Sequence, residues 1–221
     1  MTPTATGGVT MESLRPGSLA EISGQTAAID RLRSLVEGMR RGTVVPPHLL
    51  LVGPPGVGKT TAARAYAREV LSGDWENSFH QLAASDDRSF RLIADRILPL
   101  TRRAPSRGAR LRIIFFDEAD LLPPESQDAL RPALEVDAGV CQFVLACNEV
   151  ERLSPPIRSR CVELEFHTIG EAEMHRLLRI ALAKTRFQVG ESELAAIVSA
   201  AGGIPREAVK LLVEQFARLP T

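Results

Sequence analysis

The sequence predicts an α/β fold: a parallel five-stranded sheet flanked by helices and followed by a small all-helical domain. Apolar runs at 48–52, 79–82, 111–116, 142–146 and 162–166 alternate with segments of helical periodicity, a pattern typical of parallel sheets. The first run is apolar, as expected for a strand that helices cover on both faces. After residue 166 the pattern is helical throughout, which indicates a separate small domain.

Helices are expected at 26–41, 59–71, 88–100 and 123–136, and then at 171–185, 191–200 and 206–218. In the first of them Ile29, Leu32, Leu35, Val36 and Met39 recur at helical spacing. The alternation V-E-L-E-F at 162–166 indicates a strand near a sheet edge, and 101–110 reads as a basic loop. We expect a flexible lead at residues 1–12, the α/β domain at 13–167 and the helical domain at 168–221.

Composition narrows the class of protein. The chain has 221 residues, 44% of them apolar, and a formal net charge of zero, so any nucleic-acid contact must come from a local patch. Cys141, Cys147 and Cys161 form no C-x-x-C pair, and the four histidines lack zinc spacing. There is no apolar leader or membrane-length run, so we expect an intracellular protein, cytoplasmic or nucleoid-associated, not secreted and without a membrane partner.

A glycine- and proline-rich loop follows the strand at 48–52. It meets the pattern G-x-x-x-x-G-K-[ST], with a strand before it and a helix after it. Its glycines let backbone N–H groups turn inward, and with the positive end of the next helix these form a phosphate cradle. Lys59 adds a charge at the β- and γ-phosphates, and Thr60 can place its hydroxyl on Mg²⁺. The predicted contacts are Gly53, Pro54, Pro55, Gly56, Val57, Gly58, Lys59, Thr60 and Thr61.

A pair of carboxylates follows the strand at 111–116. Asp117 and Glu118 lie at its carboxyl end, where ligands of open α/β sheets bind. Asp117 suits the Mg²⁺ shell, partly through water, and Glu118 suits the base that polarises an attacking water. The letters D-E-A-D at 117–120 also occur in RNA helicases, but those need two tandem domains and this chain has room for one.

Two further residues have weaker individual signals. Asn148 follows the strand at 142–146, where an amide can orient water against a γ-phosphate, although Asn after a strand is commonly a turn former. Arg160, in the triplet S-R-C, can reach the phosphate of a neighbouring subunit, although an arginine in a loop is equally a solvated residue. Arg158 lies two residues earlier and is an alternative for the same role.

With these motifs in this order, the chain resembles the AAA+ ATPase small subunit of replication factor C and the sliding-clamp loaders of archaeal and phage type. Further matching segments are LRP at 14–16, GQ at 24–25, ASDDR at 84–88, QDALR at 127–131 and PR at 205–206. Together the matches span residues 13 to 217, and S-R-C, A-S-D-x-R and Q-x-A-L-R are the more particular ones.

The resemblance implies an ATPase that takes ATP and Mg²⁺ at subunit interfaces and loads a sliding clamp onto primer–template DNA. Its partners would be other AAA+ subunits in a homo- or hetero-oligomeric ring or spiral. It implies an adenine and ribose pocket at Arg15, Pro16 and Ile22. It implies catalytic roles for Lys59, Asp117, Glu118, Asn148 as first sensor, Arg160 as arginine finger in trans, and Arg206 as second sensor on a helical lid.

Charge is unevenly placed along the chain. Residues 88–112 hold eight arginines and one aspartate, and a stretch this basic can neutralise several DNA phosphates or can equally be a solvated helix and loop. The candidate DNA contacts are Arg88, Arg91, Arg102, Arg103 and Arg107.

One departure from the family pattern leaves the role open. Family subunits carry a further helical collar domain after the lid, and this sequence stops near the lid's end. We therefore expect a truncated form, a ring that assembles in another way, or another remodelling role. The alternative functions are a different AAA+ remodeller and a nucleotide-gated assembly module with little hydrolysis.

Overall fold

The computed structural model describes residues 8–83, 97–101, 111–135 and 139–217. Its centre is a five-stranded sheet in the order β2-β3-β4-β1-β5, and every pairing is parallel. The strands are β1 (His48–Val52), β2 (Phe79–Ala83), β3 (Arg112–Asp117), β4 (Cys141–Cys147) and β5 (Cys161–Glu165). The carboxyl ends of the strands therefore meet at one edge of the sheet, where the loops that follow β1, β3 and β4 converge.

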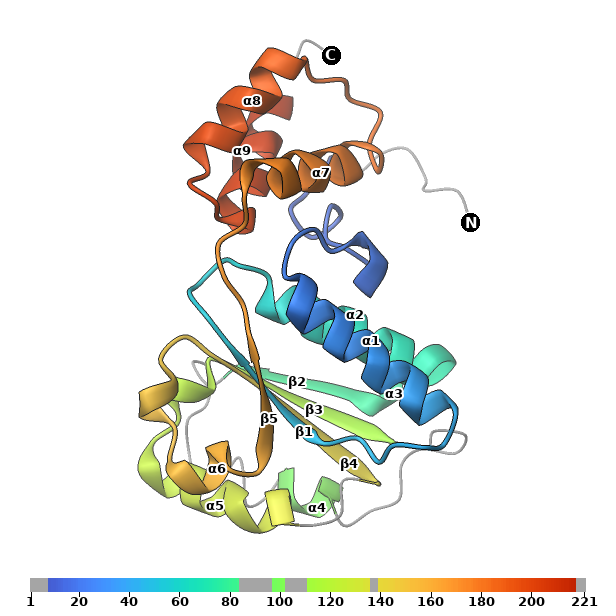
Figure 1. Cartoon of the computed structure of the whole chain (residues 1–221), viewed down its shortest axis with the longest axis vertical. Coiled ribbons are helices and arrows are strands. Elements are labelled where there is room, and N and C mark those ends of the chain that lie inside the picture. Colours follow the sequence, from blue (N-terminus) through green and yellow to red (C-terminus); the bar gives the residue numbers. More distant parts are fainter. Residues whose placement is uncertain (1–7, 84–96, 102–110, 136–138, 218–221) are drawn as a thin grey trace.

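One face of the sheet is covered by α1 (Thr26–Arg40), α2 (Lys59–Leu71) and α3 (Trp75–Ser78) (Figure 1). Helix α2 presents alanines toward the sheet, and Ala62, Ala63, Ala65 and Ala67 are buried. Small side chains let the helix approach the strands closely, so the loop that precedes it is drawn onto the sheet edge. Tyr66 is also buried there, and its hydroxyl bonds to the Gln142 side chain.

The opposite face is covered by α4 (Leu98–Thr101), α5 (Pro124–Glu135) and α6 (Pro155–Arg158) (Figure 1). Its apolar core includes Phe116, Phe143 and Leu130. His48 is buried beside this core, where its Nδ1 accepts the Phe143 N–H at 3.1 Å and it forms a hydrogen bond with the Leu134 backbone. Burial is the main reason that the pKa of His48 falls to about 4, so the ring is neutral at physiological pH.

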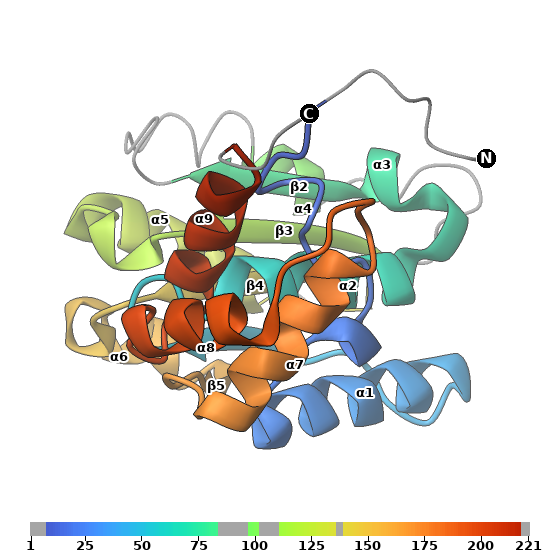
Figure 2. The ribbon, with the colours of Figure 1, turned by 90° about the horizontal axis from the view of Figure 1, so that it is seen from above.

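Three helices, α7 (Glu171–Leu182), α8 (Glu191–Ala200) and α9 (Pro205–Phe216), form a bundle at one end of the sheet (Figures 1 and 2). They enclose a core of their own, which includes Met174, Leu178, Leu194 and Leu212. Leu14 is buried in the same core, so the segment before α1 packs against the bundle. The described residues also form short 3₁₀ helices at Leu19–Glu21 (η1), Ser72–Asp74 (η2), Ala119–Leu121 (η4) and Val150–Arg152 (η5).

The sequence expectations for the sheet and the long helices are confirmed, with small shifts at element ends. The helix expected at 171–185 ends at Leu182, and the one expected at 206–218 is Pro205–Phe216. Strand β5 is an edge strand, as its alternating pattern predicts. Most of the helix expected at 88–100 and the loop at 102–110 lie outside the described residues. In the part of the chain described, no helix is long and apolar enough to cross a membrane.

Candidate nucleotide site

The candidate site lies where the loops after β1, β3 and β4 meet. Residues 53–58 connect β1 to α2, Asp117 ends β3 and Glu118 follows it, and Asn148 follows β4. Gly53, Gly56 and Gly58 all have positive φ, at 154°, 83° and 109°. These are conformations that a side chain disfavours, so the loop needs glycine at these positions.

Lys59 is the first residue of α2 and its side chain folds back over the loop. It is 7% exposed, and its Nζ donates to the carbonyls of Gly53 at 2.6 Å and Pro54 at 2.8 Å and to Asn148 Oδ1 at 2.9 Å. Burial lowers the pKa of Lys59, and nearby Asp117 opposes that shift. All three acceptors are neutral, so within the described residues the ammonium has no ion-pair partner in a site that is already partly desolvated.

Thr60 and Asp117 are joined directly. The Thr60 hydroxyl donates to Asp117 Oδ2 at 2.8 Å, which links the start of α2 to the end of β3. Glu118 has φ 55° and ψ 43°, the left-handed region, which costs a residue with a side chain of its size about 1–2 kcal/mol. Such strain concentrates at functional sites, and here it turns the chain sharply so that two adjacent carboxylates border the same cavity.

Arg206 brings α9 to the loop. Its N–H donates to the Gly56 carbonyl at 3.1 Å, and a Cβ on Gly56 would lie 2.8 Å from Ile204 Cγ2 and 3.2 Å from Arg206 Cβ. The Arg206 charge opposes the protonated forms of both Lys59 and Arg15. Burial lowers the pKa of Arg15, Glu12 opposes that change, and Arg64 and Arg206 add to it. Several cations therefore converge on one space.

That space is a cavity of about 330 Å³ between the sheet domain and the bundle. Its lining includes the loop, Asp117, Glu118 and Asn148, together with a set of apolar side chains. Leu14, Pro16, Ile22, Leu177, Ile180 and Val209 supply the apolar wall. The cavity thus offers both charged and apolar groups, the two kinds of contact that a nucleotide needs.

The predicted residues are mostly brought together. The cavity is bordered by Arg15, Pro16, Ile22, Pro55, Gly56, Val57, Gly58, Lys59, Thr60, Thr61, Asp117, Glu118, Asn148 and Arg206. Gly53 and Pro54 do not border it, but their carbonyls hold Lys59. The candidate DNA contacts Arg88, Arg91, Arg102, Arg103 and Arg107 lie outside the described residues, so their role stays a prediction.

Sequence reasoning missed Arg64, Gln81 and Glu12. Arg64 borders the cavity, donates from Nε to Gln81 Oε1 at 2.8 Å, and pairs with Glu12 at 2.7 Å. Glu12 also pairs with Arg15 at 2.9 Å. A signal for Arg64 was present, since it lies four residues after Thr60 on the same helix face. Glu12 falls within the segment expected to be a flexible lead, and in the structure it joins that segment to α2.

Arg160 does not border the cavity of its own chain. Its guanidinium pairs with Glu135 Oε1 at 2.7 Å and donates to the Pro156 carbonyl at 2.8 Å. Arg158 is exposed at the end of α6, and among the described residues it has no ion pair. Neither arginine borders the cavity, and Arg158 ends α6.

The residues present fit a nucleoside triphosphate with a divalent cation. Helix α2 begins after Gly58 without a side-chain cap, and the first N–H groups of a helix lack intrahelical partners, so they suit an anion. The three hydrogen-bond acceptors of the buried Lys59 are neutral, and the Thr60–Asp117 pair presents the oxygen ligands that Mg²⁺ prefers. In the described part of the chain no cluster of three or more His, Cys, Asp or Glu is suited to hold a metal ion.

Comparison with known proteins agrees with this geometry. The chain is 38% identical over 202 residues to the replication factor C small subunit of Archaeoglobus fulgidus, covering 91% of this chain and 62% of that protein. It is 39% identical over 203 residues to that of Methanoculleus marisnigri, covering 91% and 61%. This confirms the resemblance drawn from the motifs. The chain spans about three fifths of the length of these curated relatives.

Among solved structures, the Thermotoga maritima RuvB Holliday junction branch migration motor is similar in fold. It has a TM-score of 0.77 and 27% identity, covering 93% of this chain and 65% of that one. A family described as "ATPase family associated with various cellular activities (AAA)" matches residues 49–168, which hold the phosphate-binding loop, the acidic pair, Asn148 and Arg160. The chain therefore belongs to the AAA family of ATPases.

Proposed function

We propose that this chain is an ATP-hydrolysing subunit of a clamp-loader-type assembly, which acts with Mg²⁺ at junctions between AAA+ subunits. The observation that carries the ATPase part is the meeting of a buried Lys59, whose three hydrogen-bond acceptors are neutral, with the Thr60–Asp117 pair at the mouth of the sheet. The clamp-loader part rests on the similarity to replication factor C small subunits over 91% of the chain.

Each residue has a defined task in this proposal. Lys59 and the loop amides hold the β- and γ-phosphates, and Thr60 and Asp117 hold the cation. Glu118 polarises the attacking water, and Asn148 orients that water while it accepts from Lys59. Arg206 carries a charge from the bundle to the phosphates, so closure of the bundle completes the site.

The assembly part of the proposal concerns Arg160. Its position away from its own cavity supports a role at the site of a neighbouring copy, where it would stabilise charge in the transition state. The proposed partners are other AAA+ subunits, a sliding clamp and primer–template DNA, in a cytoplasmic or nucleoid-associated setting.

The test is steady-state ATP turnover of the full chain, alone and with primer–template DNA and a sliding clamp. We expect DNA and clamp together to raise turnover well above the basal rate. Turnover that stays flat with both present, in a protein that binds nucleotide, would reject the clamp-loader part and leave the nucleotide site standing.

A second candidate is a branch-migration-type remodeller, and the observation that favours it is the TM-score of 0.77 to RuvB. The same assay with a four-way DNA junction in place of primer–template separates the two. Stimulation by the junction, and none by clamp and primer–template, would favour the remodeller. Nucleotide-dependent assembly by light scattering, with negligible turnover on either DNA, would instead indicate an assembly module.

A further inference from the structure

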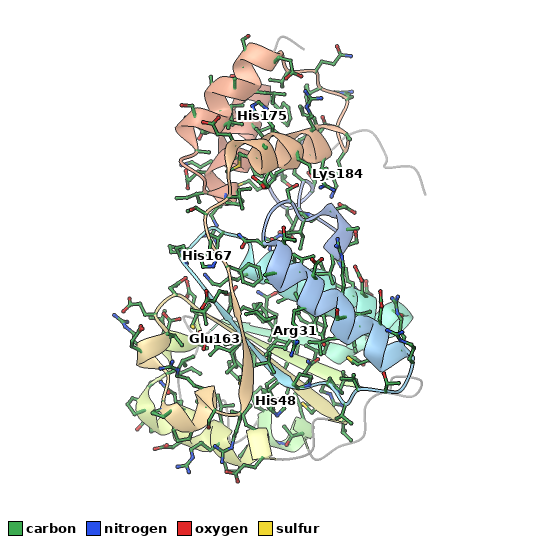
Figure 3. All side chains as sticks on the ribbon, viewed as in Figure 1. Arg31, His48, Glu163, His167, His175 and Lys184 are labelled. Atoms are coloured by element: carbon green, nitrogen blue, oxygen red, sulfur yellow. The ribbon has the colours of Figure 1, made fainter. Side chains whose placement is uncertain are left out.

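Gln25 joins the phosphate-binding loop to the connection that leads into the helical bundle. Its side-chain amide donates from Nε2 to the Val57 carbonyl at 3.3 Å and to the His167 carbonyl, and its Oε1 accepts the His167 N–H at 3.0 Å. Val57 lies in the middle of the loop. His167 lies in the connection between β5 and α7 (Figure 3). One amide group therefore contacts both the element that receives phosphates and the hinge of the bundle.

The backbone at this point is unusual in a way that serves the side chain. Gly24 and Gln25 both have positive φ, at 68° and 56°. For Gln25 this conformation is unfavourable, and it aims the amide at the two segments. A Cβ on Gly24 would lie 2.5 Å from Ile169 Cγ2, so the hinge packs directly on this turn. If this turn only had to connect η1 to α1, glycine at residue 25 would adopt the same conformation without strain.

The bundle has a second attachment to the same loop, at the start of α9. The Arg206 N–H donates to the Gly56 carbonyl, and the Ile169 N–H donates to the Gly203 carbonyl at 2.9 Å. The loop at 56–57, the hinge at 167–169 and the start of α9 thus form a closed circuit of hydrogen bonds, and Gln25 is the member that joins loop to hinge.

We propose that Gln25 is a positioning residue that couples the phosphate-binding loop to the hinge of the helical bundle, so that nucleotide in the loop sets the placement of Arg206. The second half of this statement rests on the proposed nucleotide-binding function, and the first half does not. Phosphates that order the Val57 carbonyl would tighten the hold of Gln25 on His167, and movement of the bundle would loosen the loop in return, since coupling between two sites is reciprocal.

The first experiment needs no nucleotide. NMR-detected amide hydrogen exchange is compared in the wild type, Gln25→Ala and Gln25→Gly. Both variants lose the three hydrogen bonds, but glycine also relieves the left-handed strain, so a loss of general stability would affect them differently. We expect at least fivefold faster exchange at His167 and also at the Arg206 N–H, which Gln25 does not touch. The Phe166 N–H, which donates to Val52 at 2.7 Å, should be unchanged.

The matched control is Gln215→Ala, which removes an amide that bonds to Glu193 at 3.1 Å within the bundle. It should leave exchange at Arg206 as in the wild type. Unchanged exchange at Arg206 in both Gln25 variants would overturn the coupling, whether or not the protein binds nucleotide.

The second experiment titrates the same proteins with a fluorescent non-hydrolysable ATP analogue and Mg²⁺. We expect a roughly tenfold weaker affinity in both Gln25 variants, the scale of losing one or two hydrogen bonds, and wild-type affinity in Gln215→Ala. A wild type that does not bind the analogue would refute the proposed function, and the exchange data would still decide the coupling. Tight binding by the wild type and by both variants alike would show that Gln25 does not act on the loop.

Discussion

The start of the phosphate-binding loop offers a sharp test of how tightly the hinge is packed against it. Gly53 has φ 154°, and a Cβ built on it would lie 2.1 Å from the Phe166 carbonyl oxygen and 2.9 Å from its carbonyl carbon. That carbonyl cannot easily move, because the Phe166 N–H donates to Val52 at 2.7 Å and its side chain is buried in the core. Gly53→Ala therefore forces two segments of backbone apart.

The expected loss has two parts. A backbone region that is essentially restricted to glycine costs about 1–3 kcal/mol for alanine. Displacing packed backbone adds about 1–3 kcal/mol, the range for overpacking. We expect a decrease of about 4 kcal/mol in the free energy of unfolding, which for a domain of this size lowers the melting temperature by about 8–16 °C.

Substitutions at two other glycines separate the conformational cost from the packing cost. Gly42 has φ 69° with no atom within 4 Å of its built Cβ, so Gly42→Ala should cost about 1–2 kcal/mol, from conformation alone. Gly73 lacks positive φ and also has open space, so Gly73→Ala should change stability by less than about 1 kcal/mol. Urea unfolding followed by circular dichroism measures all three. If Gly53→Ala is no less stable than Gly42→Ala, the carbonyl of Phe166 is not held as argued.

The remaining predictions concern chemistry and pH. Lys59→Ala should abolish binding of ATP in equilibrium titration, because the loop loses its one buried ammonium. Glu118→Gln should retain ATP binding and lose turnover in a steady-state assay, because the amide cannot accept the proton of the attacking water. Arg160→Ala should bind ATP normally and lose turnover in the assembly, and mixing it with Glu118→Gln copies should restore part of the activity. His48 has a pKa of about 4 when folded and about 6.5 when unfolded, so its contribution to stability is fully present above pH 6.5 and is lost as pH falls toward 4. His48→Asn should flatten that pH dependence, by up to about 1.4 kcal/mol per pH unit in urea unfolding.

Each of these predictions would be contradicted by a specific result. Equal affinity of the wild type and Lys59→Ala would contradict the loop assignment, and normal turnover of Glu118→Gln would contradict its role as base. If no mixture of the Arg160 and Glu118 variants regains activity, the arginine does not act across an interface. An identical pH slope in the wild type and His48→Asn between pH 6.5 and 4.5 would mean that the ring is not buried in its neutral form.

The sheet and the nucleotide loop could be predicted because their signals are local. The strand, the loop and the helix lie in one continuous stretch at 48–71, and the glycines of the loop indicate backbone conformations with positive φ. The carboxylates at 117–118 follow an apolar strand, and parallel strands end at the same edge. Short elements gave no such signal: α6 has four residues, fewer than are needed to show a helical period, and α3 is equally short.

The rest of the site depends on contacts between segments that are distant in the sequence. Glu12 pairs with Arg64, and Glu135 pairs with Arg160, yet each of these side chains read alone is an ordinary surface charge. Gln25 and His167 are 142 positions apart. The Gly-Gln pair matches the family pattern, but its three hydrogen bonds depend on how the bundle and the loop are placed together.

The strand order has a consequence for how the chain acquires its site during synthesis. Strand β1 lies between β4 and β5, so Leu49 pairs with Val144 on one side and with Val162 on the other. Both neighbours leave the ribosome long after β1 does, and pairings of such large sequence separation form slowly. Until residue 147 has emerged, the nascent strand at 48–52 has no ladder on either side, and until residue 165 has emerged the edge that pairs with β5 stays open. A chain that terminates early would therefore expose an aggregation-prone apolar segment as well as lack the nucleotide site. The period before β1 has gained both neighbours is when a chaperone would be of most use to the chain.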